Sequence, residues 1–210
     1  MKIDFVSDVA CPWCAVGLNS LELALAKIGP DIPVELHFRP FELNPQMGPE
    51  GEDATEHLSR KYGLTPAQLD RNRAGIRERG AAVGFQFGDR ARVWNTFDAH
   101  RLIHWAGLEG KQRELKHALF KAYHGRGDNP GAVDVLMRAA SEVGLDAERA
   151  REVIESDRYA AEVRAEERHW QQLGVNSVPS VIINDRHLIQ GGQPPEVFEQ
   201  ALRQLAGAAA

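Results

Sequence analysis

The chain has 210 residues, of which 43% are hydrophobic and 26% are charged, a composition typical of a globular protein with a substantial core. Its net charge of −5 gives no general attraction to nucleic acid or to an anionic membrane surface. No stretch approaches the about 20 apolar residues that cross a bilayer, and Asp4 and Asp8 interrupt what would be the apolar core of a signal peptide. We therefore expect a cytoplasmic protein that binds neither nucleic acid nor membranes.

The N-terminal segment is expected to form a strand, a helix and a second strand. The stretch KIDFVSDV has the apolar pattern of a short strand. From Cys11 onward, apolar residues at spacings of three and four predict a helix, with Pro12 in its first turn and Gly29-Pro30 at its end. The stretch IPVELHFRPFEL predicts a second strand. This β-α-β order is the usual precursor of a parallel strand pair.

Residues 51–173 are expected to be mostly helical. Thr65, Pro66 and Gln68 form the start signal of one helix. The stretch AVDVLMRAASEVG carries the clearest apolar stripe, which ends at Gly144. The stretch WNTFDAHRLIHWA is apolar around most of its circumference, which predicts that it lies in the centre of the helical block.

The C-terminal segment returns to strands. The runs SVIIN and RHLIQ are joined at Asn184-Asp185, which predicts a hairpin, and EVFEQALRQL predicts a closing helix. The two outer segments together supply what a small four-stranded sheet with helices needs. We therefore predict an α/β protein in which residues 1–50 and 174–210 form one domain and residues 51–173 form a helical insertion.

The two cysteines of the chain, Cys11 and Cys14, are the main chemical signal. Residues three apart on a helix have Cβ atoms about 5–6 Å apart, and the tighter first turn of a helix could bring them within reach of a disulfide. Cys14 falls on the apolar stripe. Cys11 is expected at the exposed helix start, where free N–H groups and the helix dipole favour a thiolate. An accessible thiolate backed by a sheltered thiol is what thiol–disulfide exchange requires.

Other interpretations of these residues are weaker. A structural zinc site needs four protein ligands, and the nearest histidine, His37, lies on the predicted second strand, so we expect no metal. Two inert core cysteines would not place Cys11 at a helix start. The dipeptide Val178-Pro179 precedes a predicted strand, and by itself it is most simply an ordinary trans loop proline.

Taken together, these features resemble the thioredoxin fold, and the helical insertion makes the chain resemble the DsbA family. The stretches RPFELNP, NTFDAHRL, LGVNSVPSVIIN and GGQPPEVFEQAL are similar to the FrnE-like cytosolic branch of that family. Related to this branch are the 2-hydroxychromene-2-carboxylate isomerases and the kappa-class glutathione transferases. The resemblance implies a thioredoxin fold with a large all-helical insertion.

The resemblance also implies roles for individual residues. Cys11 would be the nucleophile, and Cys14 would be the resolving thiol with which it forms a redox-active disulfide. Pro179 would be a cis-proline that faces the two cysteines. The backbone of Val178 would pair with a bound peptide or thiol compound by strand-like hydrogen bonds.

Between the cysteines, Pro12 and Trp13 would tune the redox poise, and Trp13 would offer an aromatic contact to a substrate. We therefore expect a thiol–disulfide oxidoreductase that acts on protein or small thiol substrates. It would need no cofactor besides its own disulfide, with glutathione as a candidate co-substrate, and it could form a homodimer. The alternatives are a glutathione-dependent transferase or isomerase, whose members typically carry Ser at the first active-site position, and a binding module without chemistry.

Four polar residues lie on the predicted central helix. Asp98 and Arg101 are three apart and can form an ion pair on one face, which we expect to fasten the helical block to the sheet. His100 and His104 are one turn apart, a spacing that metal ligands also use. Because the sequence shows no carboxylate or third ligand on the same face, packed or surface histidines are favoured over a metal site.

Overall fold

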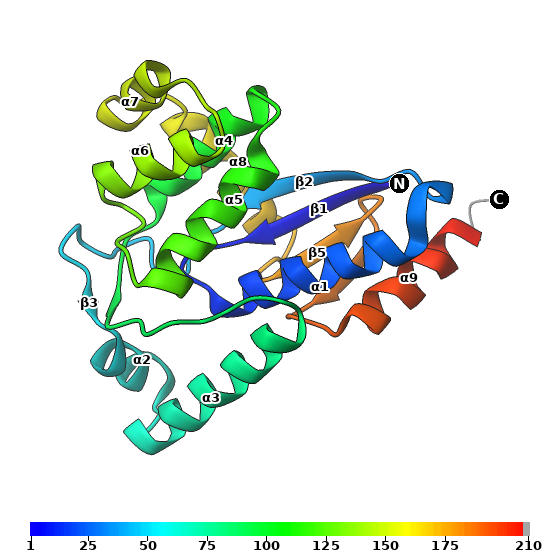
Figure 1. The fold of residues 1–210 in the computed structure, drawn as a ribbon, viewed down its shortest axis with the longest axis horizontal. Coiled ribbons are helices and arrows are strands. Elements are labelled where there is room, and N and C mark those ends of the chain that lie inside the picture. Colours follow the sequence, from blue (N-terminus) through cyan, green and yellow to red (C-terminus); the bar gives the residue numbers. More distant parts are fainter. Residues whose placement is uncertain (208–210) are drawn as a thin grey trace.

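The fold, described here for residues 1–207 of a computed structural model, is built on a four-stranded sheet of order β2-β1-β5-β6 (Figure 1). Its strands are β1 (Lys2–Ser7), β2 (Glu35–Pro40), β5 (Ser180–Ile183) and β6 (His187–Gln190). Strand β1 pairs with β2 in parallel and with β5 in antiparallel orientation, and β5 and β6 form the hairpin expected at Asn184-Asp185. A two-residue ladder between β3 (Glu52–Asp53) and β4 (Arg92–Val93) was not predicted.

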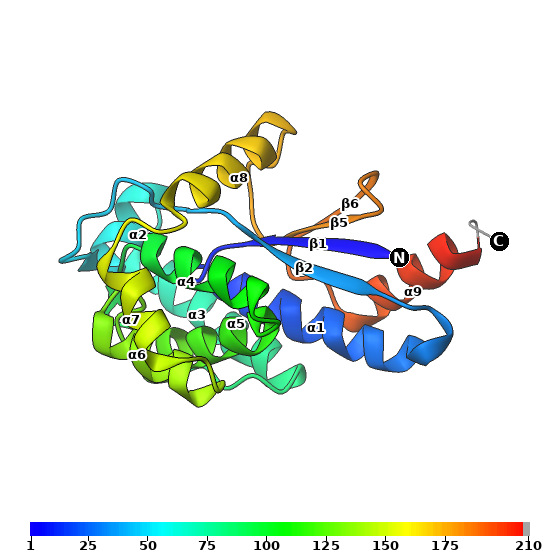
Figure 2. The same ribbon diagram turned by 90° about the horizontal axis from the view of Figure 1, so that it is seen from above.

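The helices cover both faces of the sheet. In Figure 2, α1 and α9 lie on one side of it and α8 on the other. In chain order the helices are α1 (Pro12–Ile28), α2 (Ala54–Tyr62), α3 (Pro66–Ala82), α4 (Phe97–Leu108), α5 (Gln112–Phe120), α6 (Val133–Glu142), α7 (Ala147–Glu155), α8 (Ala160–Gln172) and α9 (Pro195–Gly207). None of the helices within residues 1–207 combines the length and the apolarity that a membrane crossing needs.

The predicted order of elements is confirmed. A β-α-β unit comes first, helices follow, and a β-β-α unit closes the described chain. Strands β1, β2, β5 and β6 and helices α1 and α9 come from the two outer segments, whereas α2 to α8 come from residues 51–173. The division into two domains stays a prediction, and the last three residues of the segment 174–210 lie outside the described residues.

Strand β1 is buried on both faces, and its buried residues include the polar Asp4 and Ser7 as well as its apolar side chains. Ile3 and Phe5 belong to the main hydrophobic core, while Val6 packs in a second cluster with Phe41 and Trp170. The alternation of side chains along a strand sends these two sets to opposite faces. Strand β1 is thereby fixed between helices on both sides, and the chain that leaves its end enters the cysteine motif.

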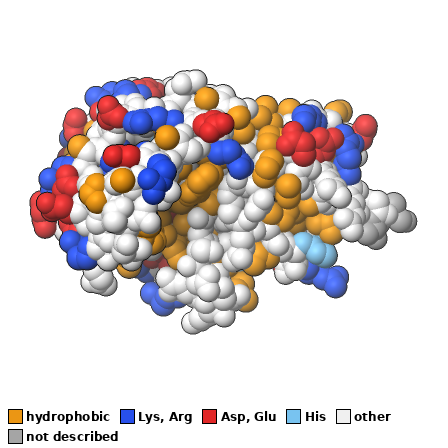
Figure 3. All heavy atoms as spheres, turned by 90° about the horizontal axis from the view of Figure 1, so that it is seen from below, with side chains coloured by type: hydrophobic (Ala, Val, Ile, Leu, Met, Phe, Trp, Pro, Cys, Tyr) orange, Lys and Arg blue, Asp and Glu red, His pale blue; other side chains and the backbone are white. Residues whose placement is uncertain are grey.

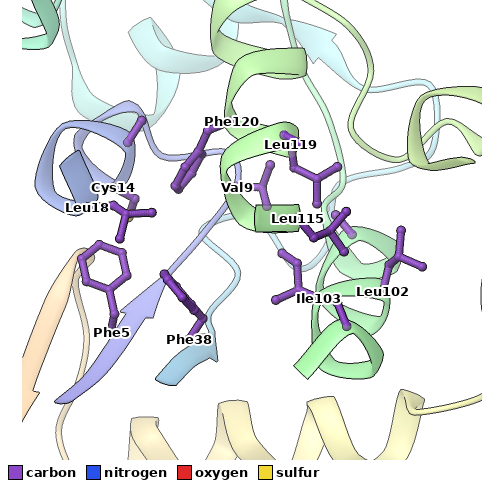
Figure 4. Packing of buried hydrophobic residues seen from close by; sticks show 14 of the residues in the cluster. Phe5, Val9, Cys14, Leu18, Phe38, Leu102, Ile103, Leu115, Leu119 and Phe120 are labelled. Atoms are coloured by element: carbon purple, nitrogen blue, oxygen red, sulfur yellow. The ribbon is translucent and has the colours of Figure 1, made fainter. Parts of the chain in front are cut away.

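The main core joins the sheet to the helical block. It contains Phe5 and Leu18 from the outer segments together with Leu102 and Leu115 from α4 and α5 (Figure 4). Each such side chain contributes about 1.5–3 kcal/mol when it is fully buried. Because Cys14 belongs to the same core, the helical block packs directly behind the cysteine motif.

Arg101 holds two helices of the block together. Its guanidinium lies 2.8 Å from the Asp98 carboxylate, so the predicted ion pair is confirmed. It also donates hydrogen bonds to backbone carbonyls at and beyond the end of α7, those of Val153, Ile154, Ser156 and Arg158. The expectation that the pair fastens the block to the sheet is therefore wrong. The reason is physical, because the carbonyls at the end of a helix lack hydrogen-bond donors within the helix. The guanidinium group of Arg101 has five N–H donors, so it can serve several of these carbonyls at once.

Candidate functional site

The two cysteines lie where strand β1 passes into helix α1. Cys11 is the residue that caps the helix, with an extended backbone (φ −89°, ψ 115°), and Pro12 is the first helical residue. The Cys11 N–H donates to the Asp8 carbonyl over 3.2 Å, and the Cys14 N–H donates to the Cys11 carbonyl over 3.1 Å. Both cysteines are free thiols. This tight first turn therefore places both thiols at the start of the same helix.

The burial of the cysteines differs from expectation in one respect. Cys14 is fully buried, as the apolar stripe predicts. Cys11 is only 5% exposed, so the expectation of an exposed thiol at the helix start is wrong. The reason lies far along the chain: the Cys11 Sγ atom lies 3.6 Å from the carbonyl oxygen of Val178, in the loop before β5. Trp13, 37% exposed, is the open member of the motif, and Pro12 is half-buried.

The loop before β5 packs closely against helix α1. The Val178–Pro179 peptide bond is cis, and Pro179 is buried. A Cβ atom on Gly17 would lie 3.0 Å from the Pro179 Cγ atom, so a side chain at this position would push against the proline ring. A Cβ atom on Gly192 would likewise lie 3.0 Å from the Trp13 carbonyl oxygen. Two glycines thus bring the cysteine helix against the proline loop and the loop after β6.

Asp8 organises the turn that leads into Cys11. It is completely buried, and its carboxylate accepts hydrogen bonds from the Ala10 N–H at 3.0 Å and the Leu43 N–H at 2.7 Å. It also accepts from the Thr96 hydroxyl at 2.7 Å and lies 3.3 Å from His100 Nε2. Burial alone would raise the pKa of Asp8, but His100 and the two N–H groups outweigh burial and lower it. An ionised carboxylate therefore ties the turn to α4.

Two arginines connect the helical block to the cysteine motif. Arg79, on α3, donates a 2.9 Å hydrogen bond to the Gly192 carbonyl, and its guanidinium lies 5.9 Å from the Trp13 ring centre. Arg90 donates to the Ala10 carbonyl over 3.0 Å. On the face drawn in Figure 3, hydrophobic side chains gather in a central hollow. Arg79 and Arg90 therefore place positive charge from the helical block beside the cysteine motif, although the chain as a whole has a negative net charge.

The pKa values of the two thiols are shifted in opposite directions. The hydrogen bond from the Cys14 thiol is the main cause that lowers the pKa of Cys11, with help from the backbone N–H groups of Cys14 and Trp13. Burial and the Asp8 charge oppose this shift. Burial, followed by the interaction with Cys11, raises the pKa of Cys14 well above its ordinary value. The arrangement favours a thiolate on Cys11 and a protonated thiol on Cys14.

Several residues around the site were not singled out from the sequence. Asp8 stands three positions before Cys11, and a carboxylate so close to a cysteine pair is a usable signal. Lys116 could have been noticed because it interrupts the apolar stripe of its helix. Arg79 and Arg90 carry no such signal, since only the fold brings α3 and the chain that follows it to the motif.

The histidines of α4 each have a carboxylate partner that the sequence did not reveal. His100 is buried beside Asp8, and His104 Nδ1 lies 3.4 Å from Glu166. The assumption that no carboxylate lies near them is therefore wrong, because the partners come from distant segments. Within residues 1–207, no group of three or more His, Cys, Asp or Glu side chains is arranged to hold a metal ion.

Known proteins share this architecture along the whole chain. The Streptomyces coelicolor protein SCO1869, described as a probable DsbA oxidoreductase, is 36% identical, with a TM-score of 0.90 over 99% of this chain and 90% of that one. A 2-hydroxychromene-2-carboxylate isomerase is 15% identical, with a TM-score of 0.73 over 98% and 96% of the two chains. The cytosolic disulfide reductase DsbM from Pseudomonas aeruginosa, solved with GSH, is 17% identical, with a TM-score of 0.68 over 98% and 99%.

The last two relatives share the fold at low identity, while SCO1869 is a relative in sequence as well. The predicted thioredoxin fold with a helical insertion is thereby confirmed. A family description, the DSBA-like thioredoxin domain, matches residues 2–203. The chain belongs to this family of DSBA-like thioredoxin domains.

Proposed function

We propose that the protein is a thiol–disulfide oxidoreductase in which Cys11 is the nucleophile and Cys14 the resolving thiol. The observation that carries the proposal is the opposite shift of two neighbouring thiols: the pKa of Cys11 is lowered and that of Cys14 is raised. The thiolate is the attacking species in disulfide exchange, so a pair in which only the first thiol ionises has a defined order of attack.

The reaction follows from this order. The Cys11 thiolate attacks a substrate disulfide, forms a mixed disulfide and releases one substrate thiol. Cys14 then loses its proton and attacks the Cys11 sulfur, which releases the second substrate thiol and leaves a Cys11–Cys14 disulfide. Two electrons pass from the cysteine pair to the substrate, and the reverse sequence oxidises a substrate dithiol.

Substrates of two kinds fit the surroundings of Cys11. Extended protein segments would meet the backbone of Val178, whose carbonyl already contacts the Cys11 thiol. Small thiols such as glutathione would meet Trp13, which is exposed, and the nearby Arg79. The relative DsbM, solved with GSH and named a cytosolic disulfide reductase, supports glutathione as a co-substrate and the cytoplasm as the compartment. A homodimer stays part of the proposal.

A mixed-disulfide trap tests the proposal. In Cys14→Ser, Cys11 can attack but the complex cannot be resolved, so a substrate from a cell lysate stays attached through a bond that dithiothreitol cleaves. Cys11→Ser is the matched control and should retain nothing. The wild type should also reduce insulin with dithiothreitol as donor. A silent insulin assay together with an empty trap would leave a binding module as the better description.

The glutathione-dependent transferase or isomerase is the competing activity, because one structural relative is an isomerase of this kind. The same variants separate the two. Glutathione conjugation that survives in Cys14→Ser, with no disulfide exchange in the wild type, would favour the competing activity, since conjugation needs no second thiol.

A further inference from the structure

A lysine is buried behind the cysteine motif. Lys116, on α5, is 1% exposed, and its ammonium nitrogen lies 5.1 Å from the centre of the Phe120 ring. Figure 4 shows Phe120 pointing from α5 toward α1, where Cys14 lies. Burial of an ammonium group is unfavourable unless something nearby compensates for it. We therefore ask which nearby groups compensate for the burial of Lys116.

The acidic groups that act on Lys116 point to the cysteine pair. They are, in order of strength, Cys14, Asp8 and Cys11. Asp8 already accepts bonds from two backbone N–H groups and from Thr96, and it contacts His100. In the other direction, the charge of Lys116 is the foremost influence that opposes the rise in the pKa of Cys14.

A small cavity lies between Lys116 and the surface. Its volume of about 10 Å³ is close to the minimum that one water molecule needs. Its lining includes the buried Lys116 and His100 together with Arg39, His104 and Glu166, whose side chains are between 21% and 27% exposed and so mark its outer end. A water molecule here would find several polar partners among these side chains, which is what a buried water requires.

Cys14 has a proton that must leave. It is fully buried, and its raised pKa keeps it protonated until it attacks. Burial lowers the pKa of Lys116 to about 8, so a fraction of this lysine is a neutral amine near neutral pH. A neutral amine can accept a proton, and its pKa close to the working pH suits proton transfer.

We propose that Lys116 accepts the proton of Cys14 when Cys14 attacks the mixed disulfide on Cys11, and that the cavity passes this proton to solvent. The inference rests on the proposed function. Neutral Lys116 becomes an ammonium ion as the Cys14 sulfur donates its electron pair to the Cys11 sulfur. The bond between Cys11 and the substrate sulfur breaks, and that sulfur leaves with the electron pair and takes a proton from solvent.

The other titratable groups near the pair are less suited to this step. Asp8 is held ionised at a lowered pKa, and its oxygens are already engaged. His124 donates its Nε2–H to the Val9 carbonyl, and burial lowers its pKa to about 3, too low to take a proton from a thiol. His100 contacts Asp8, whereas His104 and Glu166 pair with each other at the outer end of the cavity.

The two exchange steps can be timed separately with the aromatic disulfide DTNB. Attack by Cys11 releases the first thionitrobenzoate, and attack by Cys14 releases the second, so stopped-flow absorbance records two phases. In Lys116→Met the first phase should stay within about twofold of the wild type, because general-base help applies only to the second. The second phase at neutral pH should slow by about a hundredfold or more, since a hundredfold is the lower end of what a positioned base contributes. The slowed phase should recover at high pH, where Cys14 ionises unaided.

Lys116→Arg distinguishes proton transfer from simple attraction, because arginine keeps the charge but cannot accept a proton. A slow second phase in this variant supports the inference, and a normal one overturns it. Lys121→Met, which changes an exposed lysine one residue beyond α5, is the matched control and should leave both phases unchanged. Melting temperatures check that each variant folds. The pH profile of the second-phase rate in the wild type, which should show an ionisation near pH 8, tests the inference without any variant.

The result also separates two failures. If the wild type releases no thionitrobenzoate, the proposed oxidoreductase function fails. If it releases both equivalents normally and the second phase of Lys116→Met is unchanged, only the role of Lys116 is refuted.

Discussion

The Sγ atom of Cys11 lies 3.6 Å from the carbonyl oxygen of Val178, a residue 167 positions further along the chain. This contact joins the first helix to the loop before β5 and explains why Cys11 is buried. It depends on close packing between α1 and Pro179, which the absence of a side chain at Gly17 favours. The geometry around Cys11 is therefore set by backbone packing as well as by the cysteine motif.

Gly17→Val should disturb this packing. The Cβ atom of a valine at position 17 would lie about 3.0 Å from the Cγ atom of Pro179, and its two methyl groups would add to the crowding. Overpacking of this kind typically costs about 1–3 kcal/mol. We expect a lower melting temperature and faster alkylation of Cys11, because the loop that buries this thiol would pack less closely against α1. Gly75→Val is the matched control, because nothing lies within 4 Å of a Cβ atom at this position of α3. Equal effects of the two substitutions would contradict the packing argument.

The hydrogen bond between the thiols should control the ionisation of Cys11. Cys14→Ala removes the donor that is the main cause of the lowered pKa, so the pKa of Cys11 should rise in this variant. Cys14→Ser keeps an O–H donor and should preserve most of the shift. The pH dependence of iodoacetamide alkylation, followed by mass spectrometry, measures both. If the two variants ionise alike, the shift must come from the backbone N–H groups instead.

Much of this arrangement could be predicted from local sequence patterns. The remainder could not be predicted in this way. The apolar stripe predicts that Cys14 is buried, and Pro12 marks the first turn of the helix, because both signals depend on residues a few positions apart. The burial of Cys11 depends on Val178, and the partners of His100 and His104 are Asp8 and Glu166. Such contacts are set by packing between distant segments, which no periodicity within a segment encodes.

Arg101 should matter more for stability than its ion-pair partner. Its side chain is 5% exposed and holds four backbone carbonyls, whereas the side chain of Asp98 is 42% exposed. Arg101→Met leaves those carbonyls without their donor, and each buried unsatisfied group costs about 1–3 kcal/mol. We expect a larger fall in melting temperature for Arg101→Met than for Asp98→Ala. Disulfide exchange at a temperature where both variants are folded should stay close to that of the wild type. A larger effect of Asp98→Ala on exchange than on melting would instead assign that carboxylate a part in substrate binding.

His124 should make the fold sensitive to acid. Its Nε2–H donates to the Val9 carbonyl over 2.8 Å, and burial, followed by the charge of Arg90, lowers its pKa to about 3. An unfolded histidine titrates at about 6.5. Between these two values the unfolded chain binds a proton that the native protein excludes, so stability falls as the pH falls below about 6.5. From pH 7 to pH 5 this group alone should cost about 2 kcal/mol.

Urea unfolding at pH 7 and pH 5 measures this cost. In His124→Gln the amide can keep the bond to Val9 but does not titrate, so the loss of stability between the two pH values should shrink by about 2 kcal/mol. His187→Gln changes an exposed histidine on β6 and should leave the loss as in the wild type. If His124→Gln lost as much stability as the wild type over this interval, His124 would have to bind its proton in the native protein, and burial and the charge of Arg90 would not keep it neutral.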